Sequence, residues 1–438
     1  MKITQLSLDN VRAFKEAEFT FNPSFNLIIG INGAGKSTTL DTIRYCGSFL
    51  LTSLRKMPFK PFGFVADDIH GNAPFAQAAL HITFDDGEDA FVRLREWREA
   101  VVTESAENVD RLRREILETE RLRDRPRNQL RELQETVSPA ENVFYYPSAE
   151  NIRARANQEK CAPLMVHYST SRSVFRERKE RSSASAPDQA AFYEALGSST
   201  LNLRLVAEWL RAQGALVPER PASAALVKTI EDAIGTFLPG YSNLRTGDDD
   251  SAVLIDHNGM SLNVRQLSDG ERSLLSLVLD LAKRLAQANP ASENPLADCE
   301  AIVLIDEIDL HLHPKWQRKV VGNLERTFPN CQFIATTHSP QVIGEVPHEK
   351  IRIIREGKIF TPEYSFGIDS SRVLEELMET APRNTNVEEQ IGTIARLIAD
   401  GKREAASAAI DALSSEIGED DPEITRARTL LDFMEDEV

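Results

Sequence analysis

Residues 30–37 read Gly30-Ile31-Asn32-Gly33-Ala34-Gly35-Lys36-Ser37, which matches the pattern G-x-x-x-x-G-K-S. The apolar run 26–29 before it predicts a buried strand, and the segment from Lys36 to about Phe49 predicts a helix. Glycines let such a loop fold around a phosphate with its N–H groups pointing inward, and the helix adds its positive dipole end. The alternative is a glycine-rich turn that matches by chance. The strand before and the helix after favour a phosphate loop.

The polar positions of this loop have distinct expected roles. Lys36 is expected to reach the β- and γ-phosphates of a nucleotide, and the Ser37 hydroxyl is expected to bind Mg²⁺. Asn32 lies where its side chain can touch the γ-phosphate. The expected nucleotide-binding set from this half of the chain is Gly30, Asn32, Gly33, Gly35, Lys36, Ser37 and Thr38.

A second apolar run, 301–305, ends in two carboxylates, Asp306 and Glu307. A buried strand delivers a carboxylate to the edge of a sheet, where Asp306 can hold Mg²⁺. Glu307 follows it and is the expected general base for the attacking water. The alternative is a strand capped by an acidic turn, and the phosphate loop upstream favours the catalytic interpretation.

His338 follows another strand-like run, 332–337. A histidine at that point can hydrogen-bond the γ-phosphate and respond to its loss. A histidine at a strand end is also a common polar cap. Its position after Asp306 favours the nucleotide role, so His338 joins Glu307 as an expected catalytic residue.

Between the two halves, Leu267-Ser268-Asp269-Gly270-Glu271 opens an apolar-striped helix that runs to about Ala288. Ser268 is a good N-cap for that helix, and capping alone would explain it. Together with the Gly270 amide, however, the start of the helix also makes a second anion site.

These motifs, in this order, resemble those of ABC-type ATPases of the RecF, RecN and SMC branch. The resemblance implies an α/β fold: a RecF-like P-loop ATPase with a mixed sheet, a short helical insertion and a helical C-terminal tail. It implies ATP and Mg²⁺ as cofactors. It also implies an ATP-sandwich homodimer or higher oligomer, in which Ser268 and Gly270 of one subunit close on the ATP held by another. Residues 2–14 look like the family's opening strand and its Asn-Phe-Arg-like turn, so Arg12 is an expected nucleotide contact.

The run 363–378 adds a narrower resemblance, to the PtuA-type ATPases of Septu anti-phage systems and of retrons with the same effector pair. That resemblance implies a regulatory subunit that controls an HNH nuclease, PtuB. Retron versions also associate with a reverse transcriptase and its RNA–DNA product. We find no H-N-H site in this chain, and the helical pattern of its tail does not suit a Toprim nuclease. Intrinsic nuclease activity is therefore not expected.

Two other functions stay open at this point. One is a RecF-like DNA repair or recombination ATPase that clamps DNA directly. The other is a scaffold that binds ATP for assembly and scarcely hydrolyses it. An HNH protein encoded beside this gene would favour defence over repair, and negligible phosphate release would favour the scaffold.

Composition restricts the partners. The net charge is −17 (51 basic against 68 acidic residues), so the chain as a whole repels DNA. Nucleic acid is therefore expected to bind indirectly or through local basic patches. Two arginine-rich stretches are candidates for such patches. In 111–131 glutamates alternate with the arginines and favour a solvated helical face, whereas 172–181 has fewer acids.

No apolar stretch approaches the ~20 residues of a membrane span, and the four cysteines form no C-x-x-C pair. We expect a cytoplasmic protein with reduced thiols.

The pattern along the chain predicts four parts. They are an ATPase lobe with the phosphate loop (1–95), a helical insertion and variable region (96–250), a second ATPase lobe with signature, carboxylates and His338 (251–362), and a helical, acidic region (363–438). Within them, 164–168 predicts a strand, 257–259 a hairpin turn, and 388–413 a helical pair interrupted at Gly401. The last region is either a partner-docking module or a C-terminal cap on the same core.

Overall fold

The structure is a computed structural model that describes residues 1–54, 61–84, 87–98, 143–146, 148–156, 161–170, 192, 195–197, 203–216, 221–247 and 253–436. The chain divides into two compact units, Met1–Asp369 and Ser370–Val438. Both arginine-rich stretches and the helical pattern predicted at 105–137 lie outside the described residues.

The central sheet of the first unit has six strands in the order β14-β13-β3-β12-β11-β7, all parallel except the edge strand β14. Strands β7, β11 and β12 are buried along their whole length and β3 along all but its last residue, which explains their continuous apolar sequences. The predicted strands at 26–29, 164–168, 301–305 and 332–337 are confirmed to within one residue at each end. The strands are β3 (Phe25–Gly30), β7 (Met165–Tyr168), β11 (Ile302–Ile305), β12 (Gln332–Thr336), β13 (Ile351–Arg355) and β14 (Lys358–Phe360).

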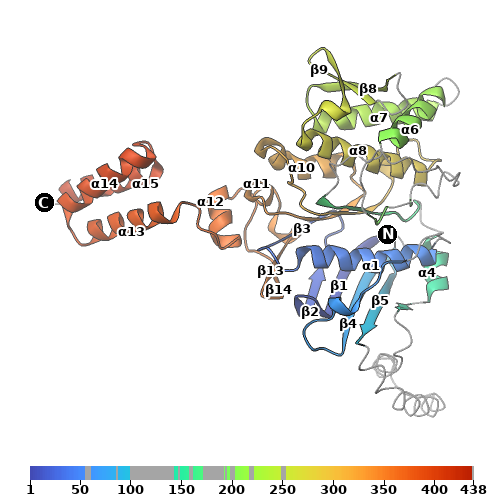
Figure 1. Cartoon of the computed structure of the whole chain (residues 1–438), viewed down its shortest axis with the longest axis horizontal. Coiled ribbons are helices and arrows are strands. Elements are labelled where there is room, and N and C mark those ends of the chain that lie inside the picture. Colours follow the sequence, from blue (N-terminus) through green and yellow to red (C-terminus); the bar gives the residue numbers. More distant parts are fainter. Residues whose placement is uncertain are drawn as a thin grey trace, which may run out of the picture. The chain divides into compact units, whose positions relative to one another are not determined.

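An antiparallel sheet in the order β2-β1-β4-β5-β6 forms a second layer. Helix α1 (Lys36–Leu54) lies between the two sheets (Figure 1), and its residues Ile43, Cys46 and Leu50 join the main hydrophobic core. Strand β4 alternates buried and half-buried residues, as expected for a sheet with one covered face. The strands are β1 (Lys2–Val11), β2 (Phe14–Thr20), β4 (Phe75–Thr83), β5 (Asp89–Trp97) and β6 (Val143–Tyr146).

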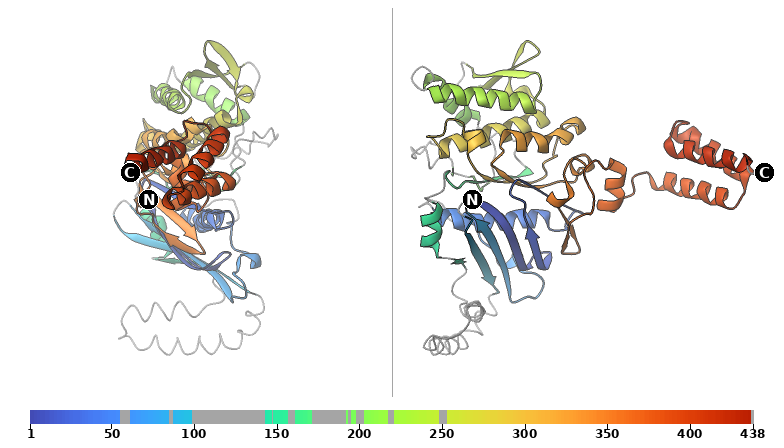
Figure 2. Two further views of the ribbon diagram at one scale, coloured as in Figure 1. Left: turned by 90° about the vertical axis from the view of Figure 1, so that its left-hand side faces the viewer. Right: turned by 180° about the vertical axis from the view of Figure 1, so that it is seen from behind.

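The opposite face of the central sheet is covered by α8 (Asp269–Ala288) and α10 (Pro314–Thr327), as Figures 1 and 2 show. Beyond them lie α6 (Leu203–Leu216), α7 (Pro221–Phe237) and a three-stranded antiparallel sheet, β10-β9-β8. The predicted hairpin is confirmed: Asn258 and Gly259 both have positive φ (51° and 78°) between β9 and β10. The strands are β8 (Tyr241–Thr246), β9 (Val253–His257) and β10 (Met260–Asn263).

Several short elements complete the first unit. They are α4 (Ala149–Ala156), α9 (Pro295–Asp298), α11 (Pro340–Ile343) and the 3-10 turns η1 (Ala66–Asp68), η3 (Val264–Gln266) and η4 (His348–Lys350). In the part of the chain that the structure describes, no helix combines the length and the apolar character that crossing a bilayer requires.

The second unit is helical and has its own small core of Ile394, Ile410, Leu413 and Ile424. The predicted break at Gly401 is confirmed, because this residue has a φ of 72° between two helices. The prediction of a helical pair was incomplete: a third helix follows, since the acidic composition of this stretch obscured the apolar position Ile424. The elements are α12 (Ser370–Arg372), the π-turn η5 (Val373–Leu377), α13 (Thr385–Ala399), α14 (Arg403–Ile417) and α15 (Pro422–Asp436).

Candidate functional site

Three of the predicted motifs meet at one edge of the central sheet. Strand β12 lies between β3 and β11 and pairs with both in parallel. Neighbouring parallel strands end on the same side, so Gly30 at the end of β3, Asp306 after β11 and His338 after β12 come to the same edge. The sheet order thus brings together residues that are far apart in the sequence.

The loop 30–37 has the backbone geometry that its glycines predict. Gly33 has a φ of 81°, in the left-handed region that side chains disfavour. A Cβ on Gly35 would lie 2.5 Å from Cζ of Phe14, so the close packing of β2 against the loop excludes any side chain there. Lys36 Nζ donates to the carbonyls of Gly30 (2.8 Å) and Ile31 (3.1 Å). The lysine therefore lies across its own loop.

The pKa of Lys36 reflects its burial and the charged groups around it. Burial lowers the pKa of this ammonium group, while Asp306, Glu307 and Asp309 oppose that change by attraction. Only 8% of the lysine is exposed. The ammonium group of Lys36 can pair with a phosphate, and a divalent cation would offset the negative charge of the three carboxylates.

Ser37 and Asp306 offer oxygens to the same point. The Ser37 hydroxyl donates to Asp306 Oδ2 at 3.5 Å, and the other carboxylate oxygen accepts a hydrogen bond from Thr336 Oγ1 at 2.7 Å. Two oxygens at this separation suit a hard cation such as Mg²⁺, which takes oxygen ligands at about 2.1 Å and completes its shell with water and phosphate. The residues present therefore fit the metal that the sequence predicts.

Glu307 sits in a constrained turn. Its φ is 47°, an uncommon conformation for a residue with a side chain. The turn is held by β12, because the Glu307 N–H donates to Thr336 Oγ1 (2.8 Å) and the Ile308 N–H to the Thr336 carbonyl (2.9 Å). Thr336 thus fixes both carboxylates, Asp306 through its side chain and Glu307 through the backbone.

His338 lies in the same electrostatic environment. Burial and the positive charge of Lys36 lower the pKa of its imidazole, against attraction from Asp309, Glu307 and Asp306. The preceding residue, Thr337, donates its hydroxyl to Asp309. His338 is therefore favoured in its neutral form. Together with Lys36, Ser37, Asp306 and Glu307, it belongs to a group of residues at the sheet edge that we call the phosphate side.

Arg12 is held by carboxylates of η1 and of α1. Its Nε donates to Asp68 Oδ1 (2.6 Å), and Nη1 pairs with Asp41 of α1 (3.2 Å). The N–H of Arg12 also donates to the Asp68 carbonyl, and its carbonyl contacts His70 Nδ1 at 2.6 Å. The guanidinium group is therefore held next to α1 by carboxylates, and its predicted nucleotide contact stays a prediction.

The run Leu267–Glu271, which corresponds to the signature motif of the resembled family, lies at the start of α8, on the other face of the sheet from α1 (Figure 1). We call it the signature segment. Ser268 and Glu271 form a reciprocal capping box, in which Ser268 N–H donates to Glu271 Oε2 at 2.8 Å. The Glu271 carboxylate also accepts from the Tyr241 hydroxyl at 2.7 Å. Burial opposes its ionisation, but these hydrogen bonds prevail and lower its pKa.

Gly270 marks a close contact between α8 and the loop after the carboxylates. A Cβ on Gly270 would lie 2.4 Å from the carbonyl oxygen of His311, so no side chain fits there. Ser268 and Gly270 line a cavity of about 800 Å³ with His311, His313 and other residues of that loop and of the start of α10. This cavity, which we call the signature cavity, contains none of the phosphate-loop residues.

Two positioning residues of the site were not predicted from the sequence. Thr336 is the first, and its place at the end of the strand between β3 and β11 was the available signal. Tyr168, at the end of β7, is the second. Its carbonyl accepts the Asp306 N–H (2.8 Å), and its buried hydroxyl donates to Asp280 of α8 (3.2 Å), which also accepts from Arg284 Nε (2.7 Å).

The fold and the motifs at the sheet edge define an ABC-type ATPase of the RecF and SMC branch. The chain belongs to the family described as "AAA domain, putative AbiEii toxin, Type IV TA system", whose model matches residues 25–344. Family membership implies nucleotide binding, and it confirms the predicted class of ATPase.

The chain is similar to proteins named as retron ATPases and as Septu PtuA. The chain is 28% identical over 423 residues to "Retron Vc95 probable ATPase" of Vibrio cholerae, a match that covers 87% of this chain and 79% of that protein. It is 50% identical over 156 residues to "Retron Ec83 probable ATPase" of Escherichia coli, covering 35% of this chain but 29% of that protein. It is 37% identical over 95 residues to "Septu protein PtuA" of Bacillus mycoides, covering 22% of this chain and 13% of that one.

Among solved structures, an SMC head bound to the C-winged helix domain of ScpA aligns with a TM-score of 0.47 and 15% identity. The alignment covers 83% of this chain and 98% of that one. The relatives in retron and Septu systems confirm the predicted resemblance to ATPases of anti-phage defence.

Proposed function

We propose that this protein binds and hydrolyses ATP with Mg²⁺, and that it regulates a nuclease in an anti-phage defence complex. The observation that carries the ATPase part is the meeting of Lys36, Ser37, Asp306, Glu307 and His338 at one edge of the central sheet. The relatives named as retron ATPases and as Septu PtuA support the defence part.

In the proposed mechanism, Lys36 exchanges its bonds to the Gly30 and Ile31 carbonyls for the β- and γ-phosphates. Ser37 and Asp306 would hold Mg²⁺, and the metal would supply positive charge that neutralises the phosphates. Glu307 accepts a proton from the attacking water. His338, whose pKa is lowered by burial and by Lys36, donates a hydrogen bond to the γ-phosphate from its neutral form.

The second half of the proposal is an ATP-sandwich dimer. The capped start of α8 lines an open cavity on the other face of the sheet from α1, and the residues that line this cavity include none of the phosphate loop. A helix N-terminus of this kind is a suitable anion site. We propose that the signature cavity of one subunit closes on the γ-phosphate held at the sheet edge of another. Hydrolysis then removes the group that joins the two subunits.

Lys36→Ala tests the site. Removal of the charge partner of the β- and γ-phosphates should abolish nucleotide binding and phosphate release. Both can be measured, by titration with a fluorescent ATP analogue and by a steady-state phosphate assay. Lys358→Ala, at an exposed lysine of β14, is the matched control and should behave as the wild type. ATP affinity that survives in Lys36→Ala would contradict the assignment.

Copurification tests the defence role. Expression of the protein from its native operon, with mass measurement of the complex, should recover an HNH nuclease bound to at least two copies of this chain. Reverse transcriptase and an RNA–DNA product should be present if the operon is a retron. Tight ATP-dependent clamping of duplex DNA by the isolated protein, with no nuclease partner, would instead favour the RecF-like repair ATPase.

A further inference from the structure

Helix α10 presents a basic face in a strongly acidic chain. Its four cations, Lys315, Arg318, Lys319 and Arg326, are exposed and lie within one face of the helix. Its single acid, Glu325, is already paired with Lys350 (2.7 Å). The helix therefore carries a net charge of +3 (four cations minus Glu325), against −17 for the whole chain. From Lys315 to Arg326 the face extends for about 16 Å.

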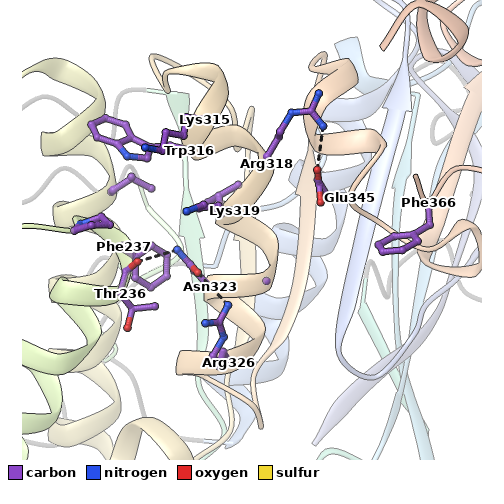
Figure 3. A pocket seen from close by; sticks show the side chains of 14 residues that line it. Thr236, Phe237, Lys315, Trp316, Arg318, Lys319, Asn323, Arg326, Glu345 and Phe366 are labelled. Carbon is purple, nitrogen blue, oxygen red and sulfur yellow. Dashed lines mark hydrogen bonds and ion pairs between the residues drawn. The ribbon is translucent and has the colours of Figure 1, made fainter. Parts of the chain in front are cut away.

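A cavity of about 660 Å³ lies over this face (Figure 3). Phe237 and Trp316 line it on one side of the helix and Phe366 lines it on the other. Phe366 is 69% exposed, although exposure is costly for such a ring. Gly322 lies in the middle of the face, and a Cβ there would meet no atom closer than 4.0 Å, so the hollow is open to a ligand.

The cations of this face are only partly neutralised. Arg318 pairs with Glu345 (3.2 Å), and Arg326 donates to the amide oxygen of Asn323 (3.4 Å), which is itself anchored to the Thr236 carbonyl. Lys315 and Lys319 have no acidic partner within the part of the chain that the structure describes. Three positive charges along the helix are therefore available to an anionic ligand.

We propose that this face of α10 binds a single-stranded nucleic acid. Lys315, Lys319 and Arg326 would contact successive phosphates, and Phe366 would provide a surface on which a base stacks. The aromatic flanks distinguish a single strand from a duplex, because duplex bases are already stacked on one another. An acidic peptide would satisfy the cations, but it would not need an exposed ring beside them. The proposal does not depend on ATP hydrolysis.

Two residues of the face are unsuitable for a test. Lys315 and Trp316 also line the signature cavity, so their substitution would confuse nucleic-acid binding with the ATP-driven dimer. Lys319 and Phe366 line the cavity over α10 but do not line the signature cavity. Both are exposed, so their variants should fold as the wild type does.

Fluorescence anisotropy with labelled oligo(dT) and oligo(rU) of about 20 nucleotides tests the proposal on the full chain. Lys319→Glu should weaken binding several-fold and reduce the slope of log K against log[salt] by about 0.7, the value for one phosphate contact on a single strand. Lys358→Glu, the same charge reversal at an exposed lysine of β14, should leave both quantities unchanged. Comparison of the two oligonucleotides identifies DNA or RNA as the better ligand.

Phe366→Ala and Phe366→Tyr test the stacking surface. The alanine variant should lose about fivefold or more in affinity, whereas tyrosine, which keeps the ring, should bind as the wild type does. ATP turnover should be unchanged in every one of these variants. The proposal is overturned if the wild type does not bind single strands or prefers a duplex of the same length. It is equally overturned if polyglutamate displaces the oligonucleotide while Phe366→Ala has no effect.

Discussion

The phosphate side of this ATPase differs from the start of α8 with its signature cavity, which we call the signature side. The difference lies in how completely the contacts of each are made within one chain. On the phosphate side, Lys36, Ser37, Asp306 and Glu307 contact their own loop, one another or Thr336, and Lys36 is buried. On the signature side, the N–H and the hydroxyl of Ser268 bond to Glu271 within the capping box, and the segment lines a wide cavity. The proposed phosphate side is thus joined by contacts within one chain, whereas the signature side borders an open cavity.

This contrast follows from the sheet. Parallel strands concentrate their carboxyl ends at one edge, so a single chain assembles phosphate loop, carboxylates and histidine there. Helix α8 begins on the opposite face of the sheet from α1. In the proposed dimer a second copy brings its start to that edge, so variants on the two sides should have separable effects.

Glu307→Gln should produce the largest effect. Loss of the proposed base should lower turnover ~10²-fold or more while ATP binding persists, so the ATP-bound dimer should accumulate. Phosphate release and light scattering measure the two outcomes.

Glu356→Gln is a close control for that change. Glu356 is an exposed glutamate with nearly the same left-handed backbone (φ 48° against 47°), and it lies between β13 and β14. If the two variants hydrolyse ATP at equal rates, Glu307 has no catalytic role and the phosphate side is not the site of chemistry.

Ser268→Arg tests the other half. The added side chain should fill the approach to the signature cavity, so ATP binding by one subunit should remain while ATP-driven association weakens about tenfold or more. Ser268→Ala separates blockage from the loss of the N-cap, which costs about 1 kcal/mol of stability. Sedimentation with and without ATP measures association. An arginine variant that dimerises and turns over normally would argue against the sandwich.

The same contrast explains what sequence could reveal. The phosphate loop, the carboxylates and the capped helix are local patterns, so their elements were predicted, although α1 ends at Leu54 and not near Phe49. Thr336 and Tyr168 act through strand neighbours distant in the chain, and neither belongs to a motif that periodicity detects. The basic face of α10 was likewise overlooked, because its cations are interleaved with the buried Val320, Val321 and Leu324 and do not form a continuous run.

Tyr168→Phe should have a smaller effect, on the connection between the two halves. The residue joins Asp306 through its carbonyl and Asp280 of α8 through its hydroxyl. Phenylalanine keeps the packing and the backbone contact but removes one buried hydrogen bond, which should cost about 1 kcal/mol in the free energy of unfolding. Urea denaturation measures it. Tyr146→Phe, at a ring that is 58% exposed, is the control and should cost almost nothing.

The smallest expected effect concerns pH and His338. Its folded pKa is lowered by burial and by Lys36, so the unfolded chain takes up a proton first as the pH falls below about 6.5. Stability should therefore decrease from that pH downward and level off below the folded pKa. His338→Asn, which cannot titrate, should show a shallower decrease in urea denaturation between neutral and mildly acidic pH. Identical pH dependence in the two proteins would mean that neither burial nor Lys36 lowers the pKa of His338, and it would argue against placing the histidine on the phosphate side.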